Sequence, residues 1–268
     1  MIYNIKMSLP SFNPSMVTLV VLSLFSFLSI FSEAAPNYIT HICPDVFTFT
    51  PNSTYQFNLN LLLSSLSFNA TCESGFYNTT VGQDLANMVY GLFLCRGDVN
   101  TDVCQDCVAV AIKKIQQEYC PKGKMAVIWY DECMLRFSFS NMFDSPPLYF
   151  WNDKNITEVD RFNQLLGSMT NDSVTWATSA QPGANKFATK EANFSASIKL
   201  YSLVQCTPDM SSSSCDTCLR GLVANLPLCC GGKQGATALT PRCNVRYEVY
   251  PFYRILATPP PNGKFQAY

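Results

Sequence analysis

The sequence predicts an α+β protein made of two tandem, disulfide-stapled domains. Three observations lead to this prediction. A pattern of three cysteines occurs twice, 111 residues apart. Apolar residues at helical spacing accompany each copy of the pattern, and strand-forming residues flank the last cysteine of each copy. A repeat of this size indicates two complete domains and not a solenoid of short repeats.

The first 34 residues predict a secretory signal peptide. A polar leader with Lys6 precedes sixteen residues without a charge, from Met16 to Phe31, and Ser32 and Ala34 fit the −3 and −1 positions of a cleavage site. A membrane-spanning helix needs about 20 apolar residues, so an uncleaved anchor is the less favoured alternative. No second run of this length follows, and we expect a secreted, extracellular protein without a stable membrane span in the mature chain.

The composition restricts the classes of partner. Aromatic residues make up 13% of the chain and the net charge is −1, which excludes a disordered chain and argues against nucleic acid or an anionic membrane as partner. Only 14% of the residues are charged, well below the roughly 25% of an average domain. Attached sugars would supply the polar surface that the small number of charged residues does not. The N-glycosylation acceptors that we predict are Asn52, Asn69, Asn78, Asn155, Asn171 and Asn193.

The repeated unit has the form C-x8-C-x2-C. Its first copy runs from Cys95 to Cys107 and its second from Cys206 to Cys218. Matching pairs on both sides are Phe76 and Phe187, Tyr90 and Tyr201, Cys133 and Cys243, and Arg136 and Arg246. We therefore place the first domain at residues 37–144, a linker with two prolines at 145–159, the second domain at 160–255 and a Pro-containing tail at 256–268.

Helices and strands follow from the spacing of apolar residues. A helix is predicted after each C-x2-C pair, with buried positions Val108, Ala111, Ile112, Ile115 and Tyr119 in the first copy and Leu219, Leu222, Val223 and Leu226 in the second. Leucines at helical spacing also indicate a helix through residues 59–66. Alternating residues at 90–94 and runs of strand formers at 125–138 and 242–252 predict strands.

At these motifs the chain resembles a known family. The two C-x8-C-x2-C copies behind a signal peptide, the C-x-x-R-[FY] ending of each copy, GFYN at 75–78 and NVRYEVYPFY at 244–253 resemble the plant cysteine-rich repeat secretory proteins. Their ginkbilobin-homologous, stress-antifungal domains also form the ectodomains of cysteine-rich receptor-like kinases. The resemblance covers nearly the whole mature chain. It implies that each domain is a small antiparallel sheet packed against two helices.

Disulfides are the expected state of most of the thirteen cysteines, because secretion exposes them to an oxidising compartment, and the odd total leaves at least one free or paired outside the chain. Spacing alone leaves fifteen pairings open for six cysteines. The resemblance implies Cys43 with Cys120, Cys95 with Cys104, Cys107 with Cys133, Cys206 with Cys215, and Cys218 with Cys243. Cys72, Cys229 and Cys230 have no assigned partner: a Cys229–Cys230 bond, a link to Cys72 and an intermolecular bond all remain open.

Catalysis has little support in the sequence. The only histidine, His41, stands near the mature N-terminus, where we expect an exposed residue. Asp131 and Glu132 are adjacent, and neighbouring side chains of a strand point to opposite faces, so they form a poor acid pair. No phosphate- or dinucleotide-binding motif is present. We predict a non-enzyme without metal or cofactor.

Binding is the favoured class of function. Some relatives implied by the resemblance bind mannose through an Asn after the first cysteine, an Arg six residues before the last and a Glu five residues after it. These positions are Pro44, Val127 and Ser138 in the first domain, whereas the second keeps Glu248 and has Thr237 in the Arg position. Glu248 is therefore the candidate ligand contact, with a solvent-facing strand residue as the alternative. For Arg136 and Arg246 we expect structural contacts.

Two functions follow as hypotheses. The first is a secreted, non-enzymatic binding protein of the plant apoplast, active in defence or stress, that recognises a carbohydrate or an extracellular protein. The second is a truncated ectodomain of a cysteine-rich receptor-like kinase. An oligomer, covalent or not, is a further expectation because of the odd cysteine count.

Overall fold

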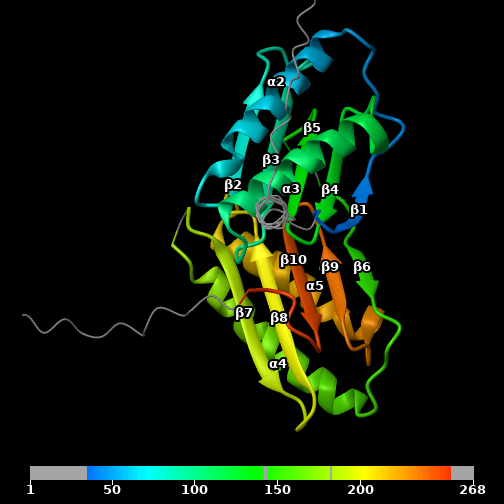
Figure 1. Ribbon diagram of the computed structural model, residues 1–268, viewed down its shortest axis with the longest axis vertical. Helices are drawn as coiled ribbons and strands as arrows, with labels where there is room; N and C mark the ends of the chain where they lie inside the picture. The colour runs from blue at the N-terminus through cyan, green and yellow to red at the C-terminus, as the bar shows by residue number, and fades with distance from the viewer. Residues whose placement is uncertain (1–34, 142–143, 182, 255–268) are drawn as a thin grey trace, which may run out of the picture. The chain divides into compact units, whose positions relative to one another are not determined.

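The computed structural model describes residues 35–141, 144–181 and 183–254, and Figure 1 shows the order of their elements. The predicted signal peptide and the whole of the predicted tail lie outside these residues. In the described part, no helix combines the length and the apolar character that a membrane span requires.

The first domain is one antiparallel sheet with helices on it. The strand order is β1-β4-β5-β3-β2. The strands are β1 (Tyr38–Ile42), β2 (Phe76–Val81), β3 (Val89–Cys95), β4 (Ala126–Tyr130) and β5 (Cys133–Ser138). The helices are α2 (Thr54–Phe68), the 3₁₀ turn η1 (Asn69–Thr71), α3 (Thr101–Lys114) and its π-helical extension η2 (Ile115–Tyr119).

The second domain repeats this arrangement with the order β6-β9-β10-β8-β7. Its strands are β6 (Leu148–Trp151), β7 (Lys186–Asn193), β8 (Lys199–Cys206), β9 (Ala236–Leu239) and β10 (Cys243–Glu248). Its helices are α4 (Val159–Thr178) and α5 (Ser212–Cys230). Each domain is thus an antiparallel sheet packed against two helices, which confirms the predicted fold class.

Helices α3 and α5 each begin where a polar side chain caps them. Asn100 Oδ1 accepts the N–H of Val103 at 2.9 Å before α3, and Ser211 Oγ accepts the N–H of Ser214 at 3.1 Å before α5. Each cap stands four residues ahead of the first cysteine of its C-x2-C pair. The C-x2-C pairs therefore lie inside α3 and α5, and the expectation that the helices follow them is wrong.

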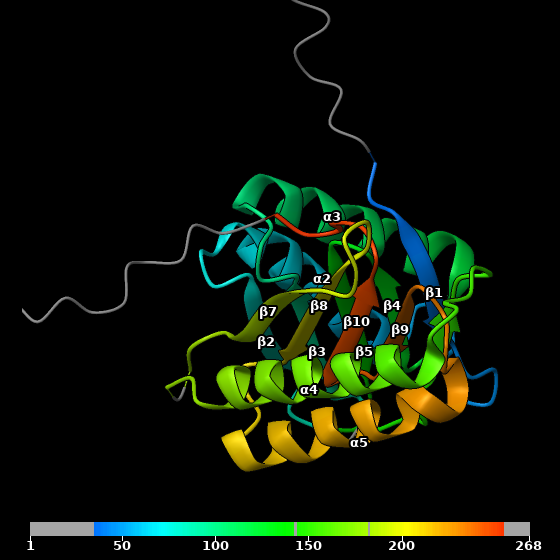
Figure 2. The same ribbon diagram turned by 90° about the horizontal axis from the view of Figure 1, so that it is seen from below.

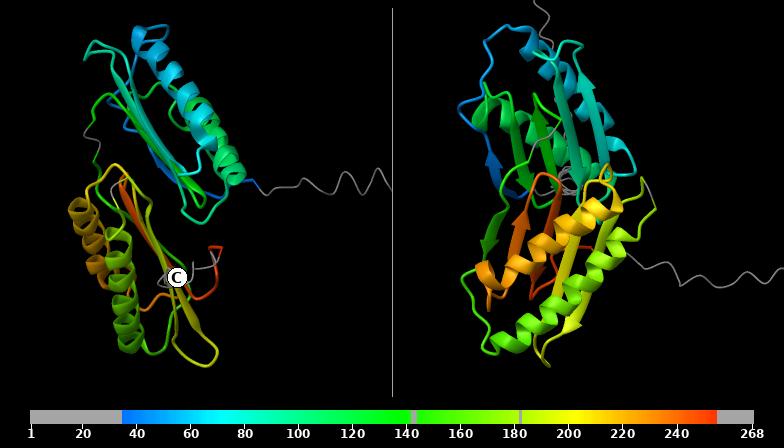
Figure 3. Two further views of the ribbon diagram at one scale, coloured as in Figure 1. Left: turned by 90° about the vertical axis from the view of Figure 1, so that its left-hand side faces the viewer. Right: turned by 180° about the vertical axis from the view of Figure 1, so that it is seen from behind.

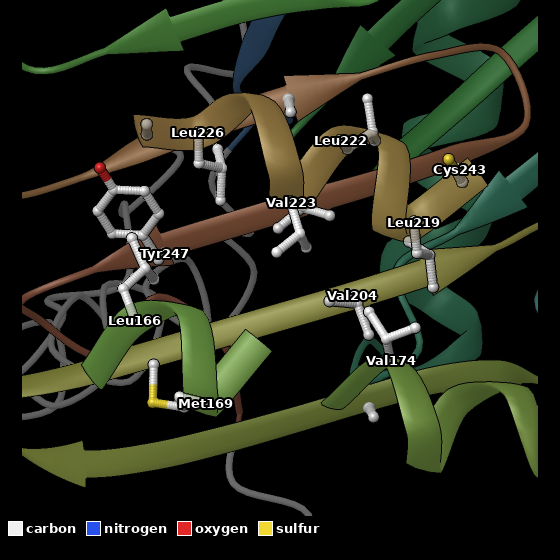
Figure 4. Close-up of a cluster of buried hydrophobic side chains, with 14 of the residues drawn as sticks. Leu166, Met169, Val174, Val204, Leu219, Leu222, Val223, Leu226, Cys243 and Tyr247 are labelled. Atoms are coloured by element: carbon white, nitrogen blue, oxygen red, sulfur yellow. The ribbon is translucent and has the colours of Figure 1, made fainter. Parts of the chain in front are cut away.

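The two helices of each domain cover one face of its sheet (Figures 2 and 3). Between α4, α5 and the sheet of the second domain lies a closed apolar core (Figure 4). Its members include Leu166, Met169, Val174, Val204, Leu219, Leu222, Leu226 and Tyr247. The apolar spacing of α5 predicted three of them, because a helix on a sheet must bury one stripe.

The predicted linker is not a linker over its whole length. Residues 148–151 of this segment form β6, which pairs with β9 and is the edge strand of the second sheet, and α4 begins at Val159. Four strand formers after two prolines carry too short an alternating pattern to indicate a strand. Pairing with β9 supplies the hydrogen bonds that make it one.

The domains contact each other through the sheet faces that the helices leave uncovered. Leu92, Leu94 and Trp129 of the first sheet share an apolar cluster with Leu148 and Leu239 of the second domain. The buried Gln205 Nε2 donates to the carbonyl of Cys95 at 2.9 Å, which satisfies two groups that would otherwise be buried without a partner.

Six disulfides staple the chain. Cys95–Cys104 and Cys107–Cys133 join α3 to the ends of β3 and β5, and Cys206–Cys215 and Cys218–Cys243 do the same for α5. Cys43–Cys120 closes the first domain. Cys229 bonds to Cys230, and Cys72 is a half-buried free thiol.

The disulfides of the first domain should differ in their contribution to stability. Cys43–Cys120 spans 77 residues and Cys95–Cys104 spans 9. Because a longer closed loop restricts the unfolded chain more, we expect the double variant Cys43→Ala/Cys120→Ala to lose about 4–5 kcal/mol and Cys95→Ala/Cys104→Ala about 3 kcal/mol. Urea unfolding of both variants measures the difference. A larger loss in the second variant would contradict loop entropy as the cause.

Candidate ligand-binding site

The strand register places an asparagine where the sequence comparison between the domains found none. In the first domain Ile42 pairs with Val127, so the next two positions are Cys43 and Pro44. In the second domain Phe150 pairs with Thr237, the counterpart of Val127, and the next two positions are Trp151 and Asn152. Asn152 therefore occupies the place of Pro44. Sequence alone did not reveal Asn152, because the Asn position is recognised by the cysteine before it. The second domain has Trp151 in place of that cysteine.

A polar cluster, made of Asp131, Asn152, Arg246, Glu248 and Tyr250, surrounds this position. Arg246 donates through Nε (3.3 Å) and Nη2 (3.2 Å) to Oε1 of Glu248. Its Nη1 donates to Oδ1 of Asp131 in the first domain at 3.0 Å, and its Nη2 also reaches the Tyr250 hydroxyl at 3.4 Å. One guanidinium thus holds two carboxylates together across the domain contact.

The second carboxylate oxygen of Glu248, Oε2, lies 3.5 Å from the amide of Asn152. That amide satisfies its backbone neighbours when its oxygen accepts the N–H of Gly235 (2.9 Å) and its nitrogen donates to the carbonyl of Lys154 (3.1 Å). Asn152 thereby ties the end of β6 to the start of β9, at the place where the first domain has a disulfide.

Burial dominates the electrostatics of Glu248. Only 7% of the residue is exposed, so the alternative of a solvent-facing strand residue is wrong. Burial raises the pKa of the Glu248 carboxyl above its ordinary value of 4.5, although Arg246 acts in the opposite direction. Burial likewise raises the pKa of the Tyr250 hydroxyl.

Aromatic side chains frame the cluster. Phe150 shares a cross-strand row with Thr237 and Arg246 and is 38% exposed. Tyr250 is 48% exposed, and the Phe252 ring lies 4.4 Å from the guanidinium carbon of Arg246. Carboxylate, amide and guanidinium groups beside exposed rings are the groups that bind a molecule with hydroxyls and an apolar face.

The corresponding positions of the first domain carry no such cluster. Pro44 and Val127 offer no side-chain donor, and Ser138 is buried. Arg136 is the counterpart of Arg246, and burial lowers the pKa of its guanidinium. Of the two domains, only the second combines an amide, a guanidinium and a carboxylate.

The residues considered for catalysis serve other contacts. His41 is not an exposed terminal residue: it lies in β1, its ring stacks on Tyr119 at 4.4 Å, and its Nδ1 is 2.6 Å from the Tyr38 hydroxyl. Asp131 and Glu132 lie in the turn between β4 and β5 and not in a strand. Glu132 accepts the backbone N–H of Asn37 at 3.0 Å. Within the described ranges, no three His, Cys, Asp or Glu side chains gather as a metal site would require.

The predicted glycosylation acceptors differ in exposure. Asn52, Asn78, Asn155, Asn171 and Asn193 are exposed. Asn69 is half-buried, and its amide donates to the carbonyl of Ser65 at 2.9 Å, so a sugar on this nitrogen would compete with a structural hydrogen bond.

Comparison with known proteins identifies the repeated unit. The profile of the family described as salt stress response/antifungal matches residues 42–140 and 151–250. The chain is 44% identical over 245 residues to Cysteine-rich receptor-like protein kinase 25 of Arabidopsis thaliana; the match covers 87% of this chain and 36% of that protein. It is 36% identical to Cysteine-rich repeat secretory protein 38 of the same organism, over 88% of this chain and 94% of that protein.

Solved structures agree with the fold. The tandem DUF26 ectodomain of the Arabidopsis thaliana cysteine-rich receptor-like protein PDLP8 superposes with a TM-score of 0.66 at 25% identity, covering 80% of this chain and 98% of that one. The chain spans little more than a third of Cysteine-rich receptor-like protein kinase 25 and nearly the whole of Cysteine-rich repeat secretory protein 38.

Glu248 should make stability depend on pH. Since its pKa in the folded state lies above 4.5, the folded protein binds this proton more tightly than the unfolded chain does. The stabilisation that this proton gives the folded protein is therefore complete below pH 4.5 and is lost as the pH rises through the pKa of Glu248 in the folded state. We expect Glu248→Gln to lose less stability than the wild type as the pH rises above 4.5, measured by urea unfolding. Parallel pH profiles would contradict this.

Gly235 should tolerate no side chain. A Cβ at this position would lie 1.7 Å from Oε2 of Glu248. We expect Gly235→Ala to cost about 1–3 kcal/mol in thermal or urea unfolding, and Glu248→Ala to relieve part of that loss. The matched control is Gly221→Ala in α5, where a Cβ meets nothing within 4 Å and helix propensity should add up to about 1 kcal/mol. Equal changes in stability for Gly235→Ala and Gly221→Ala would contradict a clash between residue 235 and Glu248.

Proposed function

Because the chain belongs to the salt stress response/antifungal family, we propose that it is a secreted, non-enzymatic recognition protein of the plant apoplast that binds a carbohydrate through its second domain. Twelve of its thirteen cysteines lie in disulfides, which form and persist in an oxidising compartment. The relative that it covers almost completely is named a secretory protein. A role in defence or stress follows from the family description.

The observation that carries the binding proposal is the position of Asn152 beside Glu248. Both stand at the places where sugar-binding relatives use an Asn and a Glu. The position where those relatives use an Arg is Thr237 in this domain. Arg246 of β10 pairs with Thr237 of β9 and brings a guanidinium beside that position. Oε1 of Glu248 accepts from Arg246, and Oε2 lies on the Asn152 side of the carboxylate, where the proposal places the bond to a ligand hydroxyl. Phe150 and Tyr250 supply apolar surface.

A glycan array tests this function on glycosylated protein secreted from a eukaryotic host. We expect binding to one class of saccharide and a loss of about tenfold or more in Glu248→Gln, because a buried charged hydrogen-bond partner contributes roughly 1.5–3 kcal/mol. Gly221→Ala in α5, where a Cβ meets nothing within 4 Å, changes neither proposed site and should leave binding unchanged. An array without any signal would exclude the carbohydrate and leave an extracellular protein as the ligand.

A truncated receptor ectodomain is the second candidate function. The 44% identity to a receptor-like kinase of which this chain spans 36% supports it. The two functions predict different transcripts: an open reading frame that continues into about 20 apolar residues beyond Tyr268 supports the receptor.

A further inference from the structure

The acceptor Asn78 stands at the edge of the first sheet. It lies in β2, which pairs with β3 on one side only and ends the strand order (Figure 1). Its side chain is exposed, and Asn78-Thr79-Thr80 is a complete N-x-T acceptor.

The strand register shows which side chains surround this amide. Phe76, Asn78 and Thr80 point to one face because side chains alternate along a strand. Opposite them on β3 stand Leu94, Leu92 and Tyr90. The intervening Gly91 faces α2, since a Cβ there would lie 2.3 Å from Leu62. Asn78 therefore projects from the face that the helices leave uncovered, between an aromatic residue two positions earlier and the hydroxyl of Thr80.

On this face lies a hollow of about 210 Å³, which we call the Asn78 hollow. Its lining includes Asn78, Thr80, Tyr90, Arg136, Ser138 and, from the second domain, Asp209. It is smaller than the roughly 300–1,000 Å³ clefts that hold drug-sized ligands, and its size suits a sugar unit.

The lining has the chemistry of an amino-sugar site. N-acetylglucosamine presents hydroxyls, an acetamide and an apolar C–H face. Tyr90 provides apolar surface for that face. A guanidinium, here that of Arg136, is a hydrogen-bond donor, and a carboxylate, here that of Asp209, is an acceptor for sugar hydroxyls.

We propose that the Asn78 hollow is the seat of the protein's own glycan, with the first N-acetylglucosamine on Asn78 packed against Tyr90 beside Arg136. In the attachment step, Nδ2 of Asn78 bonds to C1 of a lipid-diphosphate-linked oligosaccharide, the C1–O bond breaks, the lipid diphosphate leaves, and the amide loses one proton. The glycan is tethered at the wall of the hollow, so it occupies the hollow at high effective concentration. This inference is independent of the proposed sugar site in the second domain.

Site-resolved deglycosylation of the native protein tests whether the Asn78 glycan occupies the hollow. The full secreted chain from a mammalian cell line is treated with peptide N-glycosidase F, and the conversion of each Asn to Asp is followed by mass spectrometry. Asn193, exposed at the end of the matching edge strand β7 and outside the hollow, is the internal reference. We expect release at Asn78 to be about tenfold slower than at Asn193. This ratio corresponds to a glycan that is bound in the hollow about ten times as often as it is free.

Substitutions in the hollow should remove this protection. Tyr90→Ala deletes apolar surface and Asp209→Asn, at an exposed position, deletes the charge of an acceptor without touching the core. Each should bring the Asn78 rate closer to that of Asn193. Tyr201→Ala changes the counterpart of Tyr90 in the second domain and should leave the Asn78 rate unchanged. Circular dichroism verifies that each variant is folded, and Asp209→Asn remains informative if Tyr90→Ala is not.

Three results would overturn the proposal. They are an unmodified Asn78, release at Asn78 as fast as at Asn193 in the wild type, and protection that persists in both hollow variants. Protection that the hollow variants abolish and Tyr201→Ala preserves supports it.

Discussion

The fold depends on two cysteines one helical turn apart. Cys104 and Cys107 lie on the same helix and bond to Cys95 at the end of β3 and Cys133 at the start of β5. Because Cys95 and Cys133 pair directly in the sheet, the two bonds fix α3 on the two central strands that carry it. The second domain repeats the arrangement with α5. Small sheets with modest cores need such covalent restraints, and everything on the uncovered face relies on them.

The second domain departs from the first where the third disulfide is missing. Cys43–Cys120 closes the first domain, whereas the corresponding strand residue in the second is Trp151 and its nearby cysteines bond to each other. Asn152 takes over part of the restraint through hydrogen bonds to the backbone of Gly235, just before β9, and of Lys154, in the loop after β6. The same residue lies beside Glu248, so the loss of a disulfide and the gain of a polar cluster occur at one place.

Local pattern made much of the fold predictable. The stripe of Leu59, Leu62, Leu63 and Leu66 is the buried face of α2, and the strand formers on either side of Cys133 are β4 and β5. The boundaries were less predictable, because Asn100 and Ser211 cap the helices ahead of the motif cysteines. β6 escaped prediction altogether, since four residues show no period and only pairing with β9 makes them a strand.

By itself, the sequence determined the two repeats, the apolar stripes of α2, α3 and α5, the cysteines that repeat and the positions of the N-x-S/T acceptors, because periodicity and repetition are properties of the chain alone. Only the tertiary structure decided that Cys229 bonds to Cys230 and leaves Cys72 free, that Asn152 stands at the place of Pro44, and that Arg246 joins Glu248 to Asp131. The same is true of the hollow beside Asn78. Each of these features depends on which distant segments meet, and strand pairing and domain contact set that geometry.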